Sequence, residues 1–186
     1  MTESRATEAS LAKPDTRRLF FALWPDAATQ DALNRTGKWL HQHWGGRRMR
    51  ADTLHLTLAF LGDLSAAQRN ALLRGIHDIP VAAFELDFDQ TGYWPHNGIG
   101  WLGLRQPSHP LESLVQALRD QLRALEIPFD ARPHTPHITL LRKTPGGAAV
   151  ECLPVNWAID GFVLVASNPQ AEGAHYDVLK KWSLTS

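Results

Sequence analysis

Two short segments with the pattern histidine, apolar residue, threonine, apolar residue lie in different halves of the chain. They constrain its fold more than any other feature of the sequence. The first lies in residues 53–62 (TLHLTLAFLG) and the second in residues 134–141 (HTPHITLL). Both alternate between apolar and polar side chains, which predicts a strand with one buried and one polar face. We interpret the pair as a degenerate internal duplication, whose halves pack about a pseudo-twofold axis so that the polar strand faces meet in a shared groove.

The rest of the chain alternates between segments with strand and helix periodicity, and strands outnumber helices. Helices are predicted after three N-cap candidates, Asp26, Ser65 and Ser108, and the Gly45-Gly46 pair ends the first of them. The pattern predicts an α+β fold of two pseudo-symmetric lobes, each an antiparallel sheet with outer helices, around a central groove. Further strands are expected at residues 17–25, 82–90, 99–104, 157–165 and 176–184, with a turn at residues 167–170.

Length and composition predict one globular domain. The 186 residues are 44% hydrophobic, which is enough for a core, while residues 1–16 are too polar to bury much and are expected to form a flexible tail. Residues 17–186 then form the single bilobal domain. Lys and Arg total 19, as do Asp and Glu, so the broad cationic surface that grips long nucleic acids is not expected.

Cysteine usage and hydropathy favour a cytoplasmic protein. Cys152 is the single cysteine and cannot form an internal disulfide, and it has no motif context that marks it as a nucleophile. The first residues lack the apolar core of a secretion signal, and no apolar run approaches the roughly 20 residues that a membrane helix needs.

The paired segments carry the chemistry of an acid and a base. Residues i and i+2 of a strand project from one face about 6.5 to 7 Å apart, so His55 with Thr57, and His137 with Thr139, each form a two-point polar site. Imidazole has an unperturbed pKa of about 6.5, which lets one ring be charged while another is neutral. Such a pair can move the two protons of a phosphoryl transfer, while the threonine hydroxyls bond the phosphate oxygens.

The segments ADTLHLTLAFLGD and RPHTPHITLLRK resemble the two signature motifs of the 2H phosphoesterase superfamily. The opening RLFFALWP and the closing segment with Phe162, Leu164, Ser167, Gly173, Tyr176 and Trp182 are similar to its bacterial 2'-5' RNA ligase-like branch, so the resemblance spans residues 17–182. It implies that His55 is the proton donor and His137 the proton acceptor. It further implies that Thr57, Thr139 and Arg142 bind the phosphate.

By this resemblance the chain is expected to hydrolyse a terminal RNA 2',3'-cyclic phosphate to a 2'-phosphate, with no metal or other cofactor. Its partners would be RNA 3' ends or small nucleotides that carry the cyclic phosphate, with no membrane and no obligate protein partner. Two alternatives remain open: 2'-5' RNA ligation, in which a 5'-hydroxyl replaces water, and a non-catalytic module that binds RNA ends or nucleotides.

Several other residues are weaker site candidates. Arg132 and Arg50, in the loops before the two motifs, are possible substrate-binding residues, although a solvated loop charge explains either one. His41 and His43 point to different faces of the predicted helix, and no carboxylate or cysteine cluster completes a metal site around them. His134 is expected to shape the loop before the second motif, and Trp24, Tyr93 and Trp94 lie near predicted strand ends, where they could line the groove.

Overall fold

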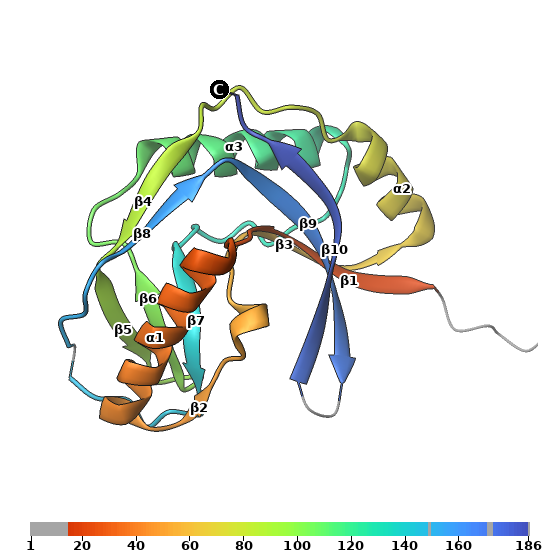
Figure 1. Cartoon of the computed structure of the whole chain (residues 1–186). Coiled ribbons are helices and arrows are strands. Elements are labelled where there is room, and N and C mark those ends of the chain that lie inside the picture. Colours follow the sequence, from red (N-terminus) through yellow and green to blue (C-terminus); the bar gives the residue numbers. More distant parts are fainter. Residues whose placement is uncertain (1–14, 149, 171–172, 186) are drawn as a thin grey trace, which may run out of the picture.

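A computed structural model describes residues 15–148, 150–170 and 173–185, and it confirms the predicted α+β class (Figure 1). Of the predicted N-terminal tail, residues 1–14 lie outside the described part. Thr16 is the first residue of β1 (Thr16–Leu23), one position before the predicted boundary. Asp15 forms an ion pair with Arg69, 2.8 Å between the carboxylate and the guanidinium.

Eight strands form one sheet. Seven of them follow the order β10-β9-β1-β3-β7-β6-β5, and the eighth, β2, also pairs with β7. All of these pairings are antiparallel. The remaining strands of this sheet are β2 (Arg47–Arg48), β3 (Leu56–Ser65), β5 (Gln90–Trp94), β6 (Ile99–Gly103), β7 (His137–Arg142), β9 (Gly161–Gln170) and β10 (Gly173–Ser183).

The two halves of the sheet meet where β3 pairs with β7, and a single residue pair, Leu56 with Ile138, joins them. These are the apolar residues that follow the two motif histidines. The sheet therefore runs through both expected lobes, and it holds the two motifs on neighbouring strands at its centre (Figure 1).

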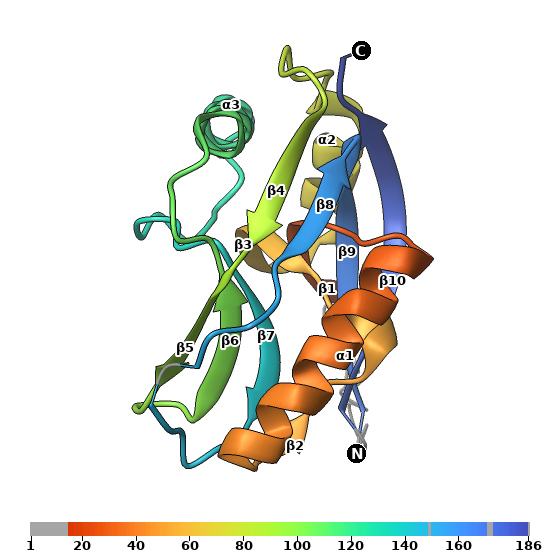
Figure 2. The same cartoon turned by 60° about the vertical axis from the view of Figure 1, so that its left-hand side comes forward.

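Three helices begin at the predicted N-caps. The Asp26 carboxylate accepts from Thr29 N in α1 (Ala27–Trp44), Ser65 forms a capping box with Gln68 in α2 (Ala66–Gly75), and Ser108 caps α3 (His109–Ala124). Gly45 ends α1 with a φ of 65°, a value that favours glycine. Helix α1 packs against β7, whereas α2 and α3 pack against β3, and Figure 2 shows α1 and α3 well separated.

Two predictions about the C-terminal strands were wrong. Residues 157–165 do not form one strand: β8 (Val155–Ile159) pairs with β4 (Phe84–Phe88) in a separate two-stranded sheet, and β9 begins after Asp160. Residues 167–170, predicted as a turn, continue β9. Asn168 of this segment bonds across the strand pair, from its Nδ2 to Asp177 Oδ2 at 2.6 Å.

A small cluster of buried side chains lies apart from the main core and beneath the groove. Phe20 and Ala22 of β1 pack in it with Val163 and Val165 of β9, and Trp24, Phe60 and Tyr176 pack against its edge.

None of the helices in the described residues combines the length and apolar character that crossing a bilayer requires.

Candidate active site

The two motifs meet in one cavity of about 420 Å³, which His55, Thr57, His137, Thr139 and Arg142 all line. Because Leu56 pairs with Ile138 in an antiparallel register, each motif histidine faces the threonine of the other motif across the strand pair. The two strands thus place two imidazoles and two hydroxyls on one surface with approximate twofold symmetry.

The backbone orients both imidazole rings in the same way. His55 Nδ1 lies 2.8 Å from the carbonyl oxygen of Thr53, and His137 Nδ1 lies 2.7 Å from that of Thr135. A carbonyl oxygen can only accept, so each Nδ1 carries a proton and donates it. Each neutral ring therefore keeps its Nε2 free of hydrogen, and this atom can accept a proton within the cavity.

A β-bulge in β7 turns Arg142 toward the cavity. Strict alternation from His137 and Thr139 would place Arg142 on the opposite, buried face. Thr139 pairs with Trp101, but the next residue of β6, Gly100, pairs with Leu141, so Leu140 is an extra residue in β7. Leu140 and Leu141 are consequently both buried, and Arg142 emerges exposed beside Thr139.

Strand β3 contains an equivalent bulge. Thr57 pairs with Ala22 and Ala59 with Phe21, so Leu58 is the extra residue, and Phe60 lines the cavity three positions beyond Thr57. Phe60 thus occupies the position in the first motif that Arg142 occupies in the second. Phe60 was not among the predicted site residues, because unbroken alternation would turn it away from the cavity.

Arg18 of β1 is a second cavity residue that was not predicted from the sequence. Its guanidinium carbon lies 4.9 Å from the centroid of the Phe60 ring, within cation-π range. The pairing of β1 with β3 brings the two side chains together, and both line the cavity. A guanidinium therefore lies in each half of the site, Arg142 directly and Arg18 over Phe60.

Aromatic rings enclose His55. The Trp24 ring stacks on the imidazole with 5.6 Å between ring centroids and an interplanar angle of 7°. The centroid of the Phe20 ring lies 4.9 Å from that of His55, and the Tyr176 ring meets the imidazole edge-on with 5.3 Å between centroids. The centroids of the Trp94 and His137 rings lie 4.5 Å apart. Of the three aromatic residues that the sequence placed near the groove, Trp24 and Trp94 contact the imidazoles, whereas Tyr93 packs against Trp44.

Burial favours the neutral form of both rings. It lowers the pKa of His55 to about 4, against the opposing effect of the Thr53 carbonyl, and the nearby His137 and Arg142 lower it further. Burial also lowers the pKa of His137, although the Thr135 carbonyl again opposes this. An anion in the cavity would counter these effects and raise both pKa values.

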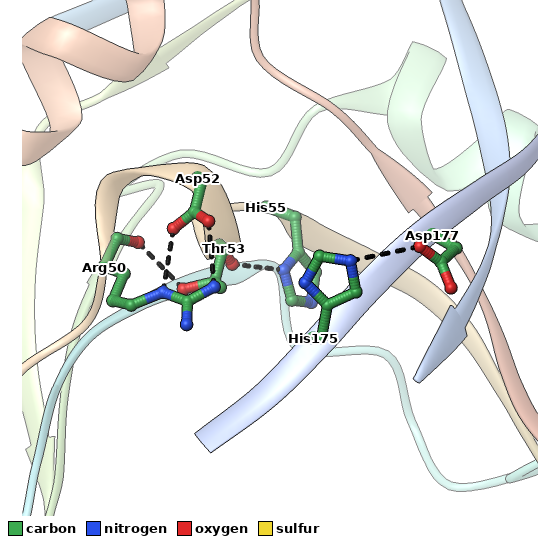
Figure 3. Close-up of polar contacts among 6 residues, drawn as sticks. All are labelled: Arg50, Asp52, Thr53, His55, His175 and Asp177. Carbon is green, nitrogen blue, oxygen red and sulfur yellow. Dashed lines mark hydrogen bonds and ion pairs between the residues drawn. The ribbon is translucent and has the colours of Figure 1, made fainter. Parts of the chain in front are cut away.

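The weaker arginine candidates lie at the two ends of this cavity. Arg50 forms an ion pair with Asp52 at 2.8 Å, next to Thr53 and His55 (Figure 3). Arg132 is exposed, pairs with Asp130, and lines an adjoining cavity of about 590 Å³ that His137 also lines. Neither arginine lines the central cavity itself.

His134 links the two motif strands. Its Nε2 lies 2.8 Å from the carbonyl oxygen of Thr57 and donates to it. The loop before β7 is thereby fastened to β3 beside the first motif threonine. Within the described ranges, no group of three or more His, Cys, Asp or Glu side chains is arranged to hold a metal ion.

Comparison with known proteins identifies similar chains. The family model for LigT-like phosphoesterases matches residues 23–101. A protein of Escherichia coli (strain K12) named RNA 2',3'-cyclic phosphodiesterase is 37% identical over 174 residues, which cover 91% of this chain and 97% of that protein. A protein of Thermus thermophilus with the same name is 31% identical over 179 residues, 90% of each chain. The crystal structure of E. coli LigT complexed with 3'-AMP has a TM-score of 0.80 and 35% identity, and covers 92% of this chain and 100% of that one.

Proposed function

The chain belongs to the LigT-like phosphoesterase family, within the 2H phosphoesterase superfamily, and on this premise we propose that it hydrolyses RNA 2',3'-cyclic phosphates to 2'-phosphates. The observation that carries the proposal is the pair of imidazoles, His55 and His137, that line one cavity with the same tautomer. Two relatives carry the name of this activity, and the cavity offers the acid, the base and the hydroxyl groups that it needs.

In the proposed reaction His137 acts as the base and His55 as the acid. Nε2 of neutral His137 takes a proton from water, whose oxygen attacks the phosphorus. The bond from phosphorus to the 3' oxygen breaks on the opposite side, and that oxygen takes the proton from Nε2 of protonated His55. The product keeps a phosphate on the 2' oxygen, and proton exchange with solvent restores both rings.

Three side chains hold the phosphate between the rings. The hydroxyls of Thr57 and Thr139 donate to non-bridging oxygens, and the Arg142 guanidinium provides a charged, bidentate donor. The anionic substrate raises the lowered pKa of His55, which favours its protonation when substrate is bound. The face of the stacked Trp24 ring also stabilises the imidazolium that then forms.

The proposal is tested by incubating the purified chain with an oligonucleotide that ends in a 2',3'-cyclic phosphate, in the presence of EDTA. We expect hydrolysis to a 2'-phosphate. His55→Ala and His137→Ala should each lower kcat by about 100-fold or more, since general acid and base steps contribute typically 10² to 10⁴. His77→Ala, which removes an exposed histidine outside the cavity, is the matched control.

The products separate this proposal from its alternatives. Joining of the cyclic end to an added 5'-hydroxyl strand, without hydrolysis, would identify a ligase. Tight binding without turnover would identify a binding module. Near-normal kcat in either histidine variant would contradict the assigned roles.

We also propose that the chain acts on RNA 3' ends in the cytoplasm, without an obligate protein partner. A lone cysteine fits a reducing compartment, where disulfides are rare. The balanced charge of the chain fits recognition of an RNA end better than of a long duplex.

A further inference from the structure

A second cavity, of about 270 Å³, continues the groove beyond the catalytic cavity. Four arginines line it, and no acidic side chain is among the described residues that do so. It shares Met49, Thr53, Arg142, Ala174 and Tyr176 with the catalytic cavity, so the two are continuous. The arginines are Arg47, Arg48, Arg50 and Arg142.

The arrangement of these arginines is unfavourable without an anion. Arg47 of β2 pairs directly with Arg142 of β7, and both side chains are exposed. Like charges placed opposite each other on neighbouring antiparallel strands destabilise the pairing. An anion held between the two guanidinium groups would reverse the sign of this interaction.

Local partners hold the other two arginines. Arg48 Nη2 donates at 2.6 Å to Oδ1 of Asn34 in α1, so the Arg48 guanidinium lies on the α1 face of the sheet, opposite to Arg47 and Arg142. Arg50 is held by Asp52, and Figure 3 shows this ion pair next to Thr53 and His55. Arg47 and Arg142, which pair directly, therefore supply the positive charge that faces the cavity.

The second cavity lies on the His55 side of the reacting phosphate. It shares Thr53, whose carbonyl accepts from His55, and Tyr176, whose ring meets the His55 ring edge-on. The cavity that Arg132 lines lies on the opposite side, because it shares His137 with the catalytic cavity.

The in-line geometry of the proposed reaction places the sugar on the His55 side. The attacking and leaving oxygens lie on opposite sides of the phosphorus, and His55 protonates the leaving 3' oxygen. The ribose therefore lies against His55, and its 5' carbon can extend toward the arginine-lined cavity. Water, or a competing 5'-hydroxyl, enters from the His137 side.

We propose that the arginine-lined cavity binds the phosphate on the 5' oxygen of the nucleotide that carries the cyclic phosphate. At an RNA end this is the last internucleotide phosphate. The inference rests on the proposed function and deepens it, because the cavity gives the enzyme a preference for RNA ends over cyclic nucleotides with a free 5'-hydroxyl.

The experiment compares adenosine 2',3'-cyclic phosphate with a 5'-hydroxyl and with a 5'-phosphate. We expect kcat/KM to be about tenfold or more higher for the 5'-phosphorylated substrate, the gain of a charge-assisted contact. Arg47→Gln should bring this ratio close to one. Arg35→Gln, which removes an exposed arginine of α1 outside both cavities, should leave the ratio unchanged. A dinucleotide with a neutral methylphosphonate linkage should behave like the 5'-hydroxyl substrate.

A second measurement does not depend on turnover. Because Arg47→Gln removes one member of the like-charge pair, it should raise the Tm of the free protein by about 1 to 3 °C at low salt. A fall in Tm would contradict the proposed geometry and overturn the inference.

Two kinetic outcomes would overturn this inference and leave the proposed function standing. One is equal kcat/KM for both substrates in the unsubstituted protein. The other is loss of the 5'-phosphate preference in Arg132→Gln rather than in Arg47→Gln, which would place the sugar on the His137 side. Failure of the unsubstituted protein to hydrolyse either substrate would overturn the proposed function and, with it, this inference.

Discussion

At the scale of single residues, the surroundings of His55 have two opposing effects on its role as an acid. Enclosure by Phe20, Trp24 and Tyr176 fixes the ring and excludes water, yet the same enclosure lowers its pKa to about 4. An acid with this pKa is mostly deprotonated at neutral pH until an anion approaches. The electrostatics of the free protein therefore couple protonation of His55 to phosphate binding.

This coupling predicts different pH profiles for kcat/KM and kcat. The reactive state carries one proton on the histidine pair, so kcat/KM should be bell-shaped, with macroscopic pKa values that belong to the pair. Both pKa values are lowered in the free protein, so the pH optimum of kcat/KM should lie between about pH 4 and pH 6.5. Bound phosphate raises them, so the alkaline limb of kcat should lie at higher pH than that of kcat/KM.

Steady-state kinetics with a cyclic nucleotide from pH 4 to pH 9 measure both profiles. His77→Ala should reproduce both profiles, because the ring that it removes lies outside the cavity. Superimposable alkaline limbs for kcat and kcat/KM would show that substrate binding leaves the histidine pKa values unchanged, contrary to this account.

At the scale of strands, the bulges in β3 and β7 shape the site as much as the motifs do. Each bulge follows a motif threonine and returns a third side chain, Phe60 or Arg142, to the cavity face. The alternating pattern of the motifs was sufficient to predict which side chains share a face up to each threonine. It could not predict the bulges, because an extra residue is defined by the register against a partner strand that is distant in sequence.

The link between the loop before β7 and strand β3 gives a prediction at this scale. His134→Leu removes the bond from Nε2 to the Thr57 carbonyl, so β3 should lose its fixed position beside the phosphate. We expect kcat to fall by about tenfold with little change in KM, since small displacements of reacting groups carry large kinetic penalties. The free energy of unfolding should fall by about 1 kcal/mol.

His134→Gln is the matched variant, because its side-chain amide can still donate to the Thr57 carbonyl. It should recover most of the lost kcat. His134→Leu should also keep the pH limbs of the unsubstituted protein, because His134 positions the strand and transfers no proton. A displaced pH limb, or no recovery in His134→Gln, would contradict this role.

At the scale of the whole molecule, the pairing of β3 with β7 explains why one groove carries matching groups from both halves of the chain. The alternation of strand and helix patterns was sufficient to predict an α+β fold, and the paired motifs were sufficient to predict a meeting of the two polar faces. The division between β8 and β9 was missed because Val155–Ile159 and Gly161–Gln170 are similarly apolar, and only their partners, β4 and β1, distinguish them. Arg47 was missed because a strand of two residues has no periodicity to detect.

The buried histidines also predict how the stability of the whole fold depends on pH. Burial lowers the pKa of His55, His134 and His137 below the unfolded value of about 6.5, so the unfolded chain binds protons first as the pH falls. Their contribution is complete above about pH 6.5 and is lost as the pH falls toward the folded pKa values. For His55, with a folded pKa of about 4, the loss between pH 7 and pH 5 amounts to about 2 kcal/mol.

Urea unfolding at pH 7 and pH 5 measures this loss. The lowered carboxyl pKa values, such as that of Asp130 at about 2, affect stability only in more acidic solution, so the histidines dominate this window. His55→Gln cannot be protonated, and its free energy of unfolding should fall by about 2 kcal/mol less than that of the unsubstituted chain over the same interval. Equal losses in the two proteins would mean that folding leaves the pKa of His55 near its ordinary value. The ring would then be well hydrated, and phosphate binding would not be needed to protonate it.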